Sequence, residues 1–353
     1  MERLAIFDRN CSRFDSPLNT ALFAAILCVA IACGALSCGN KTQKPAKTMV
    51  FGAALLTPGP VSDAGWNAAA FDGLQLVKKE LGAETAMVQT TSPADFEDAM
   101  RDFASRGFTV IFAHGFEYTD TALRVGKLFP NTWFIVTSGS GSSTNVASVT
   151  FKIEEAAYAA GVLAGGITKT GVVGAVGGIE LPAIRLTFNG FRLGFISIRP
   201  DGRLLTSYTG SFDDVGAAKE AALAQISRGA DLIFHNADAA GLGVFKAAEE
   251  RHIYAFGSNR NQNSVIPNTV IASAVTKIPQ AFLKVATEIR DGTFKPGMIE
   301  FGMKDGMVDL VLNDALVSKI PAQAIDMTRR AEQEIKDGKI DVTTLAGTSG
   351  GGS

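Results

Sequence analysis

The sequence has few of the residues on which most metal and redox chemistry depends. It contains four cysteines and three histidines in 353 residues. The remainder of the chain after residue 38 holds no cysteine, so it can form no internal disulfide and no thiolate metal cluster. The histidines also lack the HExxH spacing of zinc enzymes, and we expect neither a metal nor a cofactor. The cysteines are Cys11, Cys28, Cys33 and Cys38.

The sequence also lacks a basic block, and its formal net charge is −2. Nucleic acids are bound through clustered positive charge, so we expect no nucleic-acid partner. No P-loop or EF-hand loop is present. The glycines of 171–178 do not have the GxGxxG spacing, and the GxSxG letters of 347–351 stand in a Gly/Ser-rich tail with no preceding strand. These absences indicate a protein that is not an enzyme.

An apolar segment opens the chain and ends abruptly. Its core, residues 21–34, is too short for a comfortable bilayer span, and small residues precede Cys38. This pattern predicts a signal peptide over 1–37, cut before a lipid-modified Cys38, with 38–48 as lipidated end and linker. Cys33 is the rival lipidation site, and an uncut signal anchor is the alternative. We therefore expect a membrane-anchored lipoprotein that faces the periplasm.

From residue 49 onward, short apolar strands alternate with helices, which is typical of parallel α/β sheets. The first helix places apolar residues on one face and ends at Gly82. The expected strands are 49–55, 85–90, 109–113, 133–137 and 147–151 in a first series, and 172–176, 203–208, 232–235, 253–257 and 269–274 in a second. The expected helices of the second half are 153–167, 182–193, 213–228, 242–251 and 278–291.

Two similar series in tandem predict an α/β protein with two parallel-sheet lobes. The alternating segments 298–303 and 307–312 complete neither series simply, so we expect the chain to cross between the lobes about three times around a hinge. Ligands of parallel sheets bind beyond the carboxyl ends of the strands, and two such edges form a cleft. The predicted boundaries are 49–152 with 276–302 for lobe 1, 153–275 with 303–346 for lobe 2, and a flexible tail at 347–353.

Polar and aromatic residues follow the first strand. The carboxylate of Asp63 is suited to accept paired N–H donors from a heterocyclic ring, and the amide of Asn67 to meet a ring nitrogen or carbonyl. The alternative for Asp63 is a helix N-cap, and both roles require its two oxygens to be divided between them. Trp66 is a candidate ligand contact, with a core position on the helix as its alternative.

Two aromatic residues stand where strands give way to helices. Phe116 follows the third strand in a loop, where a core role is harder to arrange, and Phe212 again stands at a strand-to-helix junction in the second series. One ring from each lobe can sandwich a planar ligand. Phe212 has packing beneath its helix as the alternative, and Asp213 is assigned as the N-cap of that helix.

The remaining candidates suit a sugar. Asp238 follows another strand and can accept hydrogen bonds from a vicinal diol, with capping as its alternative. Lys277 can reach ribose hydroxyls, although a solvent-facing role is the usual one for lysine. The polar loop 258–263 is expected to be mostly a solvated turn.

In this order, these motifs resemble the basic membrane protein family of substrate-binding lipoproteins. The similarity extends over nearly the whole chain after the leader. The sequence differs from the usual pattern at two places: residues 259–262 are Asn-Arg-Asn-Gln where relatives often carry DxDQ, and Gly65-Trp66 stands where relatives commonly have Ser-Phe. It rests on these segments: Asp63-Ala64-Gly65-Trp66-Asn67, Ala113-His114-Gly115-Phe116, Gly210-Ser211-Phe212-Asp213-Asp214, Asp238 to Gly243 and Val275-Thr276-Lys277.

The resemblance implies a type I periplasmic-binding-protein fold, a purine nucleoside ligand such as inosine, guanosine or adenosine, and an ABC transporter permease as partner. It implies base contacts from Asp63 and Asn67, stacking by Phe116 and Phe212, and ribose contacts from Asp238 with Lys277. Alternatives are a sugar or autoinducer receptor on the same fold, a nucleoside-processing enzyme, and a regulator of the repressor class, for which no DNA-binding helix pair precedes residue 49.

Overall fold

The computed structural model describes residues 51–63 and 65–348. The predicted signal peptide, Cys38 with its linker, and residues 349–353 of the tail lie outside the described residues. No helix in the described part of the chain is long and apolar enough to cross a membrane.

Lobe 1 is built on a six-stranded sheet in the order β11-β5-β4-β3-β1-β2, and every neighbouring pair in it is parallel. The central strands β1 and β3 are buried at every position and are accordingly mostly apolar, whereas the edge strands β2 and β11 are partly exposed. Its strands are β1 (Gly52–Thr57), β2 (Glu84–Gln89), β3 (Val110–His114), β4 (Trp133–Thr137), β5 (Val146–Phe151) and β11 (Met298–Phe301).

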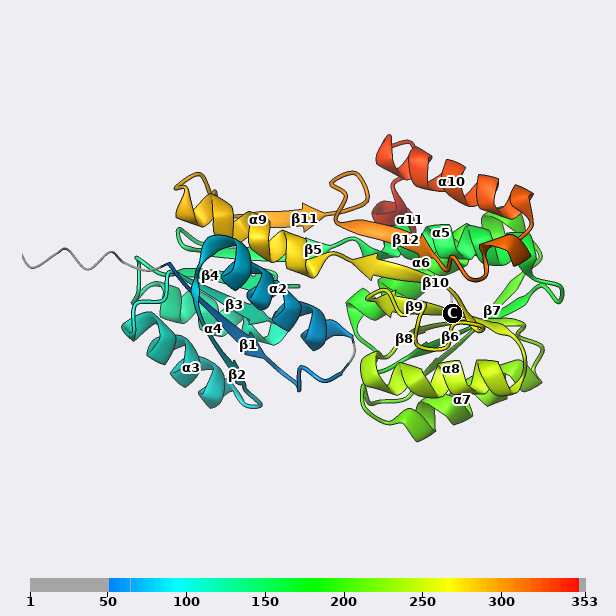
Figure 1. Cartoon of the computed structure of the whole chain (residues 1–353), viewed down its shortest axis with the longest axis horizontal. Helices are drawn as coiled ribbons and strands as arrows, with labels where there is room; N and C mark the ends of the chain where they lie inside the picture. The colour runs from blue at the N-terminus through cyan, green and yellow to red at the C-terminus, as the bar shows by residue number, and fades with distance from the viewer. Residues whose placement is uncertain (1–50, 64, 349–353) are drawn as a thin grey trace, which may run out of the picture. The chain divides into compact units, whose positions relative to one another are not determined.

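Helices cover both faces of this sheet. Two of them share a hydrophobic cluster with Ala53, Leu55 and Phe112, and the other two pack on Ala54 and Ile111, which point the opposite way along the same strands. In Figure 1, α2 in blue and α9 in yellow lie beside each other although they are about 200 residues apart in sequence. The first pair is α2 (Trp66–Leu81) and α9 (Ile278–Arg290), and the second is α3 (Pro93–Ser105) and α4 (Thr119–Gly126).

Lobe 2 repeats this plan with the order β12-β10-β9-β8-β6-β7, in which only β12 is antiparallel to its neighbour. Helices α5, α6, α10 and α11 cover one face, and α7 with α8 covers the other. The strands are β6 (Val172–Gly177), β7 (Arg203–Tyr208), β8 (Leu232–Asn236), β9 (Tyr254–Asn259), β10 (Val270–Thr276) and β12 (Val308–Leu312). The helices are α5 (Ile153–Ile167), α6 (Pro182–Ile198), α7 (Val215–Ser227), α8 (Gly241–Glu250), α10 (Ala322–Lys336) and α11 (Val342–Thr348).

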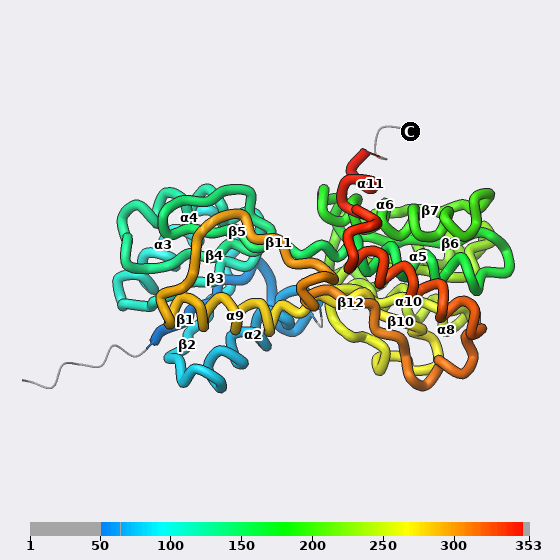
Figure 2. Tube along the Cα trace, turned by 90° about the horizontal axis from the view of Figure 1, so that it is seen from above, coloured from blue at the N-terminus to red at the C-terminus, as the bar shows by residue number. Residues whose placement is uncertain are grey.

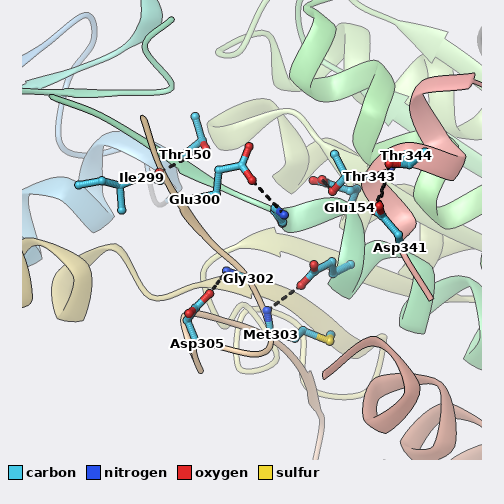
Figure 3. A network of polar contacts seen from close by, with 12 residues as sticks. Thr150, Glu154, Ile299, Glu300, Gly302, Met303, Asp305, Asp341, Thr343 and Thr344 are labelled. Atoms are coloured by element: carbon cyan, nitrogen blue, oxygen red, sulfur yellow. Dashed lines mark hydrogen bonds and ion pairs between the residues drawn. The ribbon is translucent and has the colours of Figure 1, made fainter. Parts of the chain in front are cut away.

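The chain passes between the lobes three times: from β5 to α5, from β10 to α9, and from β11 to β12. The first and third passages are linked by a backbone hydrogen bond of 2.9 Å from the Lys152 N–H to the Phe301 carbonyl and by the Lys152–Glu300 ion pair at 3.0 Å. The Met303 N–H also donates to Glu155 Oε2 over 2.6 Å. Figure 2 traces β11 and β12 in orange through this region. Figure 3 shows the polar contacts of the segment that joins them, with Glu300, Gly302, Met303 and Asp305 labelled.

The local signals for two helices can be compared directly with the structure. Gly82 is the C-cap of α2 with a φ of 62°, the left-handed conformation that glycine adopts without strain, as predicted. The predicted N-cap of α7, Asp213, is wrong by one residue. Asp214 caps α7, because its Oδ1 accepts the Ala217 N–H over 2.8 Å, while Asp213 lies exposed outside the helix.

Small residues bring α5 and α6 into very close contact. A Cβ atom added at Gly161 of α5 would lie 2.0 Å from the Phe191 carbonyl oxygen, and one at Gly194 of α6 would lie 1.9 Å from the Tyr158 carbonyl oxygen. Both obstacles are helix backbone, which cannot move aside as a side chain can. The glycines therefore set the distance between these helices, which form the face of lobe 2 nearest the first passage.

We predict that Gly161→Ala lowers the free energy of unfolding by about 1–3 kcal/mol, because the added methyl group forces the two helix backbones apart. Urea denaturation measures the effect. Gly347→Ala in α11 is the control, since no atom lies within 4 Å of its added Cβ, and it should leave stability unchanged or slightly higher. Equal unfolding midpoints for Gly161→Ala and the parent protein would contradict this close packing.

Candidate functional site

Each sheet has one position where the strand order reverses, and loops diverge there at the carboxyl ends of the strands. In lobe 1 this is between β1 and β3, and in lobe 2 between β6 and β8. In open α/β sheets, ligands bind at such switch points. Asp63 lies in the loop after β1, and Trp66 and Asn67 are the first residues of α2, to which that loop leads. Phe116 begins the short helix that follows β3, and Asp238 follows β8.

Asp63 organises the start of α2. Its Oδ1 accepts the backbone N–H groups of Gly65 and Ala68 at 3.0 and 2.9 Å, and its Oδ2 accepts that of Asn67 at 2.8 Å. The residue is buried, with 4% of its surface exposed. A carboxylate is favoured here because the first N–H groups of a helix lack intrahelical partners and carry partial positive charge. The N-cap residue of α2 is Gly65 and not Asp63, the alternative that we gave, but the Asp63 carboxylate accepts the first N–H groups of the helix with both of its oxygens.

Asn67 is buried with an unsatisfied acceptor. Its residue surface is 8% exposed, and its Oδ1 has no hydrogen-bond partner among the described residues. Its Nδ2 faces Gly59 in the loop after β1, where an added Cβ would lie 2.9 Å away. Because an unpaired buried polar group is costly, such a group in a native structure points to a partner that the chain itself does not supply.

Trp66 is half-buried and packs against the buried His114. The two rings stack with centroids 4.2 Å apart, and the indole packs against the lobe 1 core. His114 Nε2 lies 3.1 Å from the Trp66 carbonyl and Nδ1 lies 3.1 Å from Thr137 Oγ1. Burial lowers the pKa of His114 to about 3, so its ring is neutral. A carbonyl oxygen only accepts, and Nε2 therefore carries the proton.

Asp238 connects lobe 2 to the start of α2. Its Oδ1 accepts the Trp66 N–H over 3.2 Å and the Asn259 Nδ2 amide over 3.1 Å. Burial of the carboxylate, together with the negative charge of Asp63, raises the pKa of Asp238 to about 7. An added Cβ at Gly65 would lie 2.5 Å from Oδ1, so a larger residue at position 65 would collide with this contact.

The two aromatic candidates have different surroundings. Phe116, in the short helix η1 (Phe116–Tyr118), has 55% of its surface exposed, as expected for a ring that is not part of a core. Phe212 is half-buried against the lobe 2 core, as its packing alternative anticipated, and its ring lies over Gly178. The Phe212 carbonyl also accepts the Ala240 N–H, which joins its loop to the η2 turn (Asp238–Ala240).

Lys277 follows β10, and its charge is already paired. Its ammonium group forms an ion pair with Asp309 on β12, and its backbone N–H donates to the Met307 carbonyl over 2.8 Å. The preceding Thr276 donates to the Asn259 carbonyl over 3.1 Å. The structure thus brings Asp63, Trp66, Asn67 and Asp238 together around one helix end, while the charge of Lys277 is engaged by Asp309.

The comparisons with known proteins agree on one family. Residues 51–344 match the Bmp family model, which is described as ABC transporter substrate-binding protein, PnrA-like. The chain belongs to the Bmp family. It is 28% identical over 289 residues to a purine-binding protein of Brucella abortus, covering 81% of each chain. It is 29% identical over 324 residues to the ABC transporter nucleoside-binding protein BmpA of Lactococcus lactis, covering 85% of this chain and 91% of the relative.

A solved structure supports the fold. The crystal structure of an ABC transporter solute-binding protein from Aeropyrum pernix superposes with a TM-score of 0.75 at 21% identity, covering 83% of this chain and 92% of that one. The Bmp-family assignment and the fold of two α/β lobes, type I-like, confirm what the resemblance implied.

Sequence reasoning missed several residues of this Bmp-family site. Ile179 follows the switch-point strand β6, beside Gly178, and is 43% exposed. Asn259, expected in a solvated turn, is 7% exposed and binds Asp238, and Arg260 pairs with Asp72 of α2. An apolar residue directly after Gly177, which ends β6, and Gly178 was the available signal for Ile179. For Asn259 and Arg260 the signal was their position in the segment where relatives often carry DxDQ. No cluster of metal-ligating side chains is found within 51–63 and 65–348.

The raised pKa of Asp238 predicts a pH dependence of stability. A carboxyl whose pKa is raised on folding binds its proton more tightly in the folded state, so its contribution is unfavourable above about pH 7 and is relieved as the pH falls toward 4. Asp238→Asn removes this cost. Relative to the parent protein, the variant should be more stable at pH 8 than at pH 5 by about 2–3 kcal/mol.

Thermal unfolding at the two pH values measures this difference. The exposed Asp201→Asn in lobe 2 is the control and should change stability alike at both. The same response from both variants would show that the burial of Asp238 has no energetic consequence.

Proposed function

We propose that this Bmp-family protein is the receptor of an ABC transporter that captures purine nucleosides outside the cytoplasm, tethered by a lipid on Cys38, and performs no chemistry on them. The coarser part of this function follows from the family, whose members are substrate-binding proteins of ABC transporters. The nucleoside ligand is supported by the relatives named as purine-binding and nucleoside-binding.

The observation that carries the ligand class is the carboxamide of Asn67. It is buried beside the lobe 1 switch point, and its Oδ1 is an acceptor without a donor in the described residues. A purine offers N–H groups in the plane of a flat ring, which match a single fixed acceptor in a low-dielectric site. We assign Asn67 to the edge of the base. The Oδ2 of Asp63 accepts only one hydrogen bond, so we assign any contact between Asp63 and the base to that oxygen.

The aromatic residues supply the faces that such a ring requires. Phe116 presents an exposed ring on lobe 1, and Phe212 has a half-buried ring on lobe 2, beside Gly178. Stacking on an aromatic side chain contributes about 1–3 kcal/mol per base. We propose that the base lies between these two surfaces, with Trp66 supporting the Asn67 end of α2.

The ribose is assigned to the lobe 2 side. The hydrogen bonds from Trp66 and Asn259 both reach Oδ1 of Asp238, so we propose that Oδ2 accepts from a ribose hydroxyl. Lys277 can contribute only if it shares its ammonium group with Asp309. Because the nucleoside binds side chains of both lobes at once, it has a higher affinity for the closed arrangement than for the open one. Binding therefore shifts the protein toward the closed arrangement.

We predict that Phe116→Ala and Asn67→Ala each raise the dissociation constant for inosine about tenfold or more, since one loses a stacking face and the other the buried acceptor. Isothermal titration calorimetry measures both. Leu128→Ala is the control, because Leu128 is 54% exposed on lobe 1 and follows α4 away from the switch point. Unchanged affinity in both test variants, with normal thermal unfolding, would remove the proposed base site.

The same preparation separates the alternatives. A free pentose should fail to displace bound inosine, because the sugar alone makes neither the stacking nor the Asn67 contact. Incubation with inosine should release no hypoxanthine. Displacement by the pentose would indicate a sugar receptor, and release of the free base would indicate an enzyme.

A further inference from the structure

Helix α2 contacts lobe 2 at two points outside its own lobe. At its first residue, the Trp66 N–H donates to Asp238 Oδ1. Six residues further, which is about 9 Å along a helix, Asp72 Oδ2 lies 2.6 Å from Arg260 Nη2. Residues 72 and 260 belong to different lobes and are 188 positions apart in sequence.

Two adjacent residues, one at the end of β9 and one directly after it, take part in these two contacts. Asn259 holds Asp238 through its amide, and Arg260 reaches Asp72. Asn259 has a φ of 65°, a left-handed conformation that few non-glycine residues adopt and that persists where the surroundings fix it. Here the Arg260 N–H donates to the Ser258 carbonyl over 2.7 Å, and the Gln262 side chain accepts the Ser258 N–H over 2.9 Å. The turn is therefore built to present the Arg260 side chain toward α2.

We propose that Arg260 and Asp72 form a latch between the lobes, outside the ligand contacts, that favours the closed arrangement and so sets the affinity for the ligand. The part of the inference that concerns affinity rests on the proposed function. Because this pair joins residues of the two lobes, separating the lobes would break it, and it would shift the opening equilibrium by its own free energy. The apparent dissociation constant then follows the fraction of closed protein.

The expected effect is moderate. The Arg260 and Asp72 side chains are 36% and 48% exposed, so solvent and salt screen their attraction. Breaking one exposed ion pair of this kind should weaken inosine binding by about two- to fivefold at low salt, mostly through faster dissociation. The difference should shrink as the salt concentration rises.

The decisive experiment uses Arg260→Gln, Asp72→Asn, the double variant, and the exchanged pair Arg260→Asp with Asp72→Arg. Inosine affinity is measured at 50 and 500 mM salt. Each single variant should lose the same two- to fivefold, the double variant should be no weaker than either, and the exchanged pair should recover most of the loss. Additive losses in the double variant, or no recovery in the exchanged pair, would overturn the latch.

Glu250→Gln is a closely matched control. Glu250 pairs with Lys219 at 2.9 Å with side-chain exposures of 46% and 37%, but both residues lie in lobe 2, on α8 and α7. The control should leave inosine affinity unchanged. A loss equal to that of Asp72→Asn would show that the effect is general to surface charge and is not a property of the lobe-to-lobe pair.

A ligand-free measurement separates the latch from the proposed function. At 50 mM salt, small-angle X-ray scattering should give a larger radius of gyration for Arg260→Gln than for the parent protein. The radius of the parent protein should also be larger at 500 mM salt than at 50 mM salt. Equal radii throughout would contradict the latch even if inosine binds. If inosine does not bind at all, the proposed function fails, whereas the difference in scattering still supports the latch.

Discussion

The beginning of α2 is the constraint on which the site depends. The first N–H groups of this helix have no partner within the helix, and two carboxylates satisfy them. Asp63, from the same lobe, takes the N–H groups of Gly65, Asn67 and Ala68, while Asp238, from the other lobe, takes that of Trp66. One helix end is thus completed by both halves of the molecule. The proximity of the two carboxylates contributes to the raised pKa of Asp238.

A chain of buried polar contacts extends from this helix end into both lobes. In lobe 1, the neutral ring of His114 connects the Trp66 carbonyl to Thr137 on β4. In lobe 2, a second buried histidine, His235, has its Nε2 2.9 Å from Gln262 Oε1, and burial lowers its pKa to about 4. Both rings are therefore uncharged at neutral pH and serve as fixed hydrogen-bonding groups. Such fully buried networks hold the loops that present the candidate ligand contacts.

Much of the fold could be predicted because its signals are local. The strands Trp133–Thr137 and Arg203–Tyr208 and the helix Ile153–Ile167 have the predicted bounds. The first is an apolar run and the helix is rich in small residues, and both have clear ends. Helix α3 has an equally local signal, which we did not use in predicting the helices. Ser92 accepts the Asp95 N–H, and Asp95 accepts that of Ser92, which is a capping box with Pro93 at the first helical position.

The candidate site could be predicted only in part. The polar and aromatic residues after the strands were found because parallel strands bring their carboxyl ends to one edge. The sequence could not show which oxygen of each carboxylate accepts which hydrogen bonds. Asp63 and Asp238 are the same residue type, and they differ in which backbone N–H groups reach them. Lys277 was placed with the ribose contacts, yet its charge is paired with Asp309 on a strand that arrives some thirty residues later. Nothing in the sequence near position 277 encodes that partner.

The amino-acid sequence by itself determined the alternation of strands and helices, the two series of strands, the family resemblance and the loops that hold the chemistry, because these depend on short-range periodicity and on residue type. The tertiary structure alone decided that Asp72 meets Arg260 and that the Oδ1 of Asn67 has no partner among the described residues. A contact between residues 188 positions apart is fixed by packing and topology, which no local pattern records.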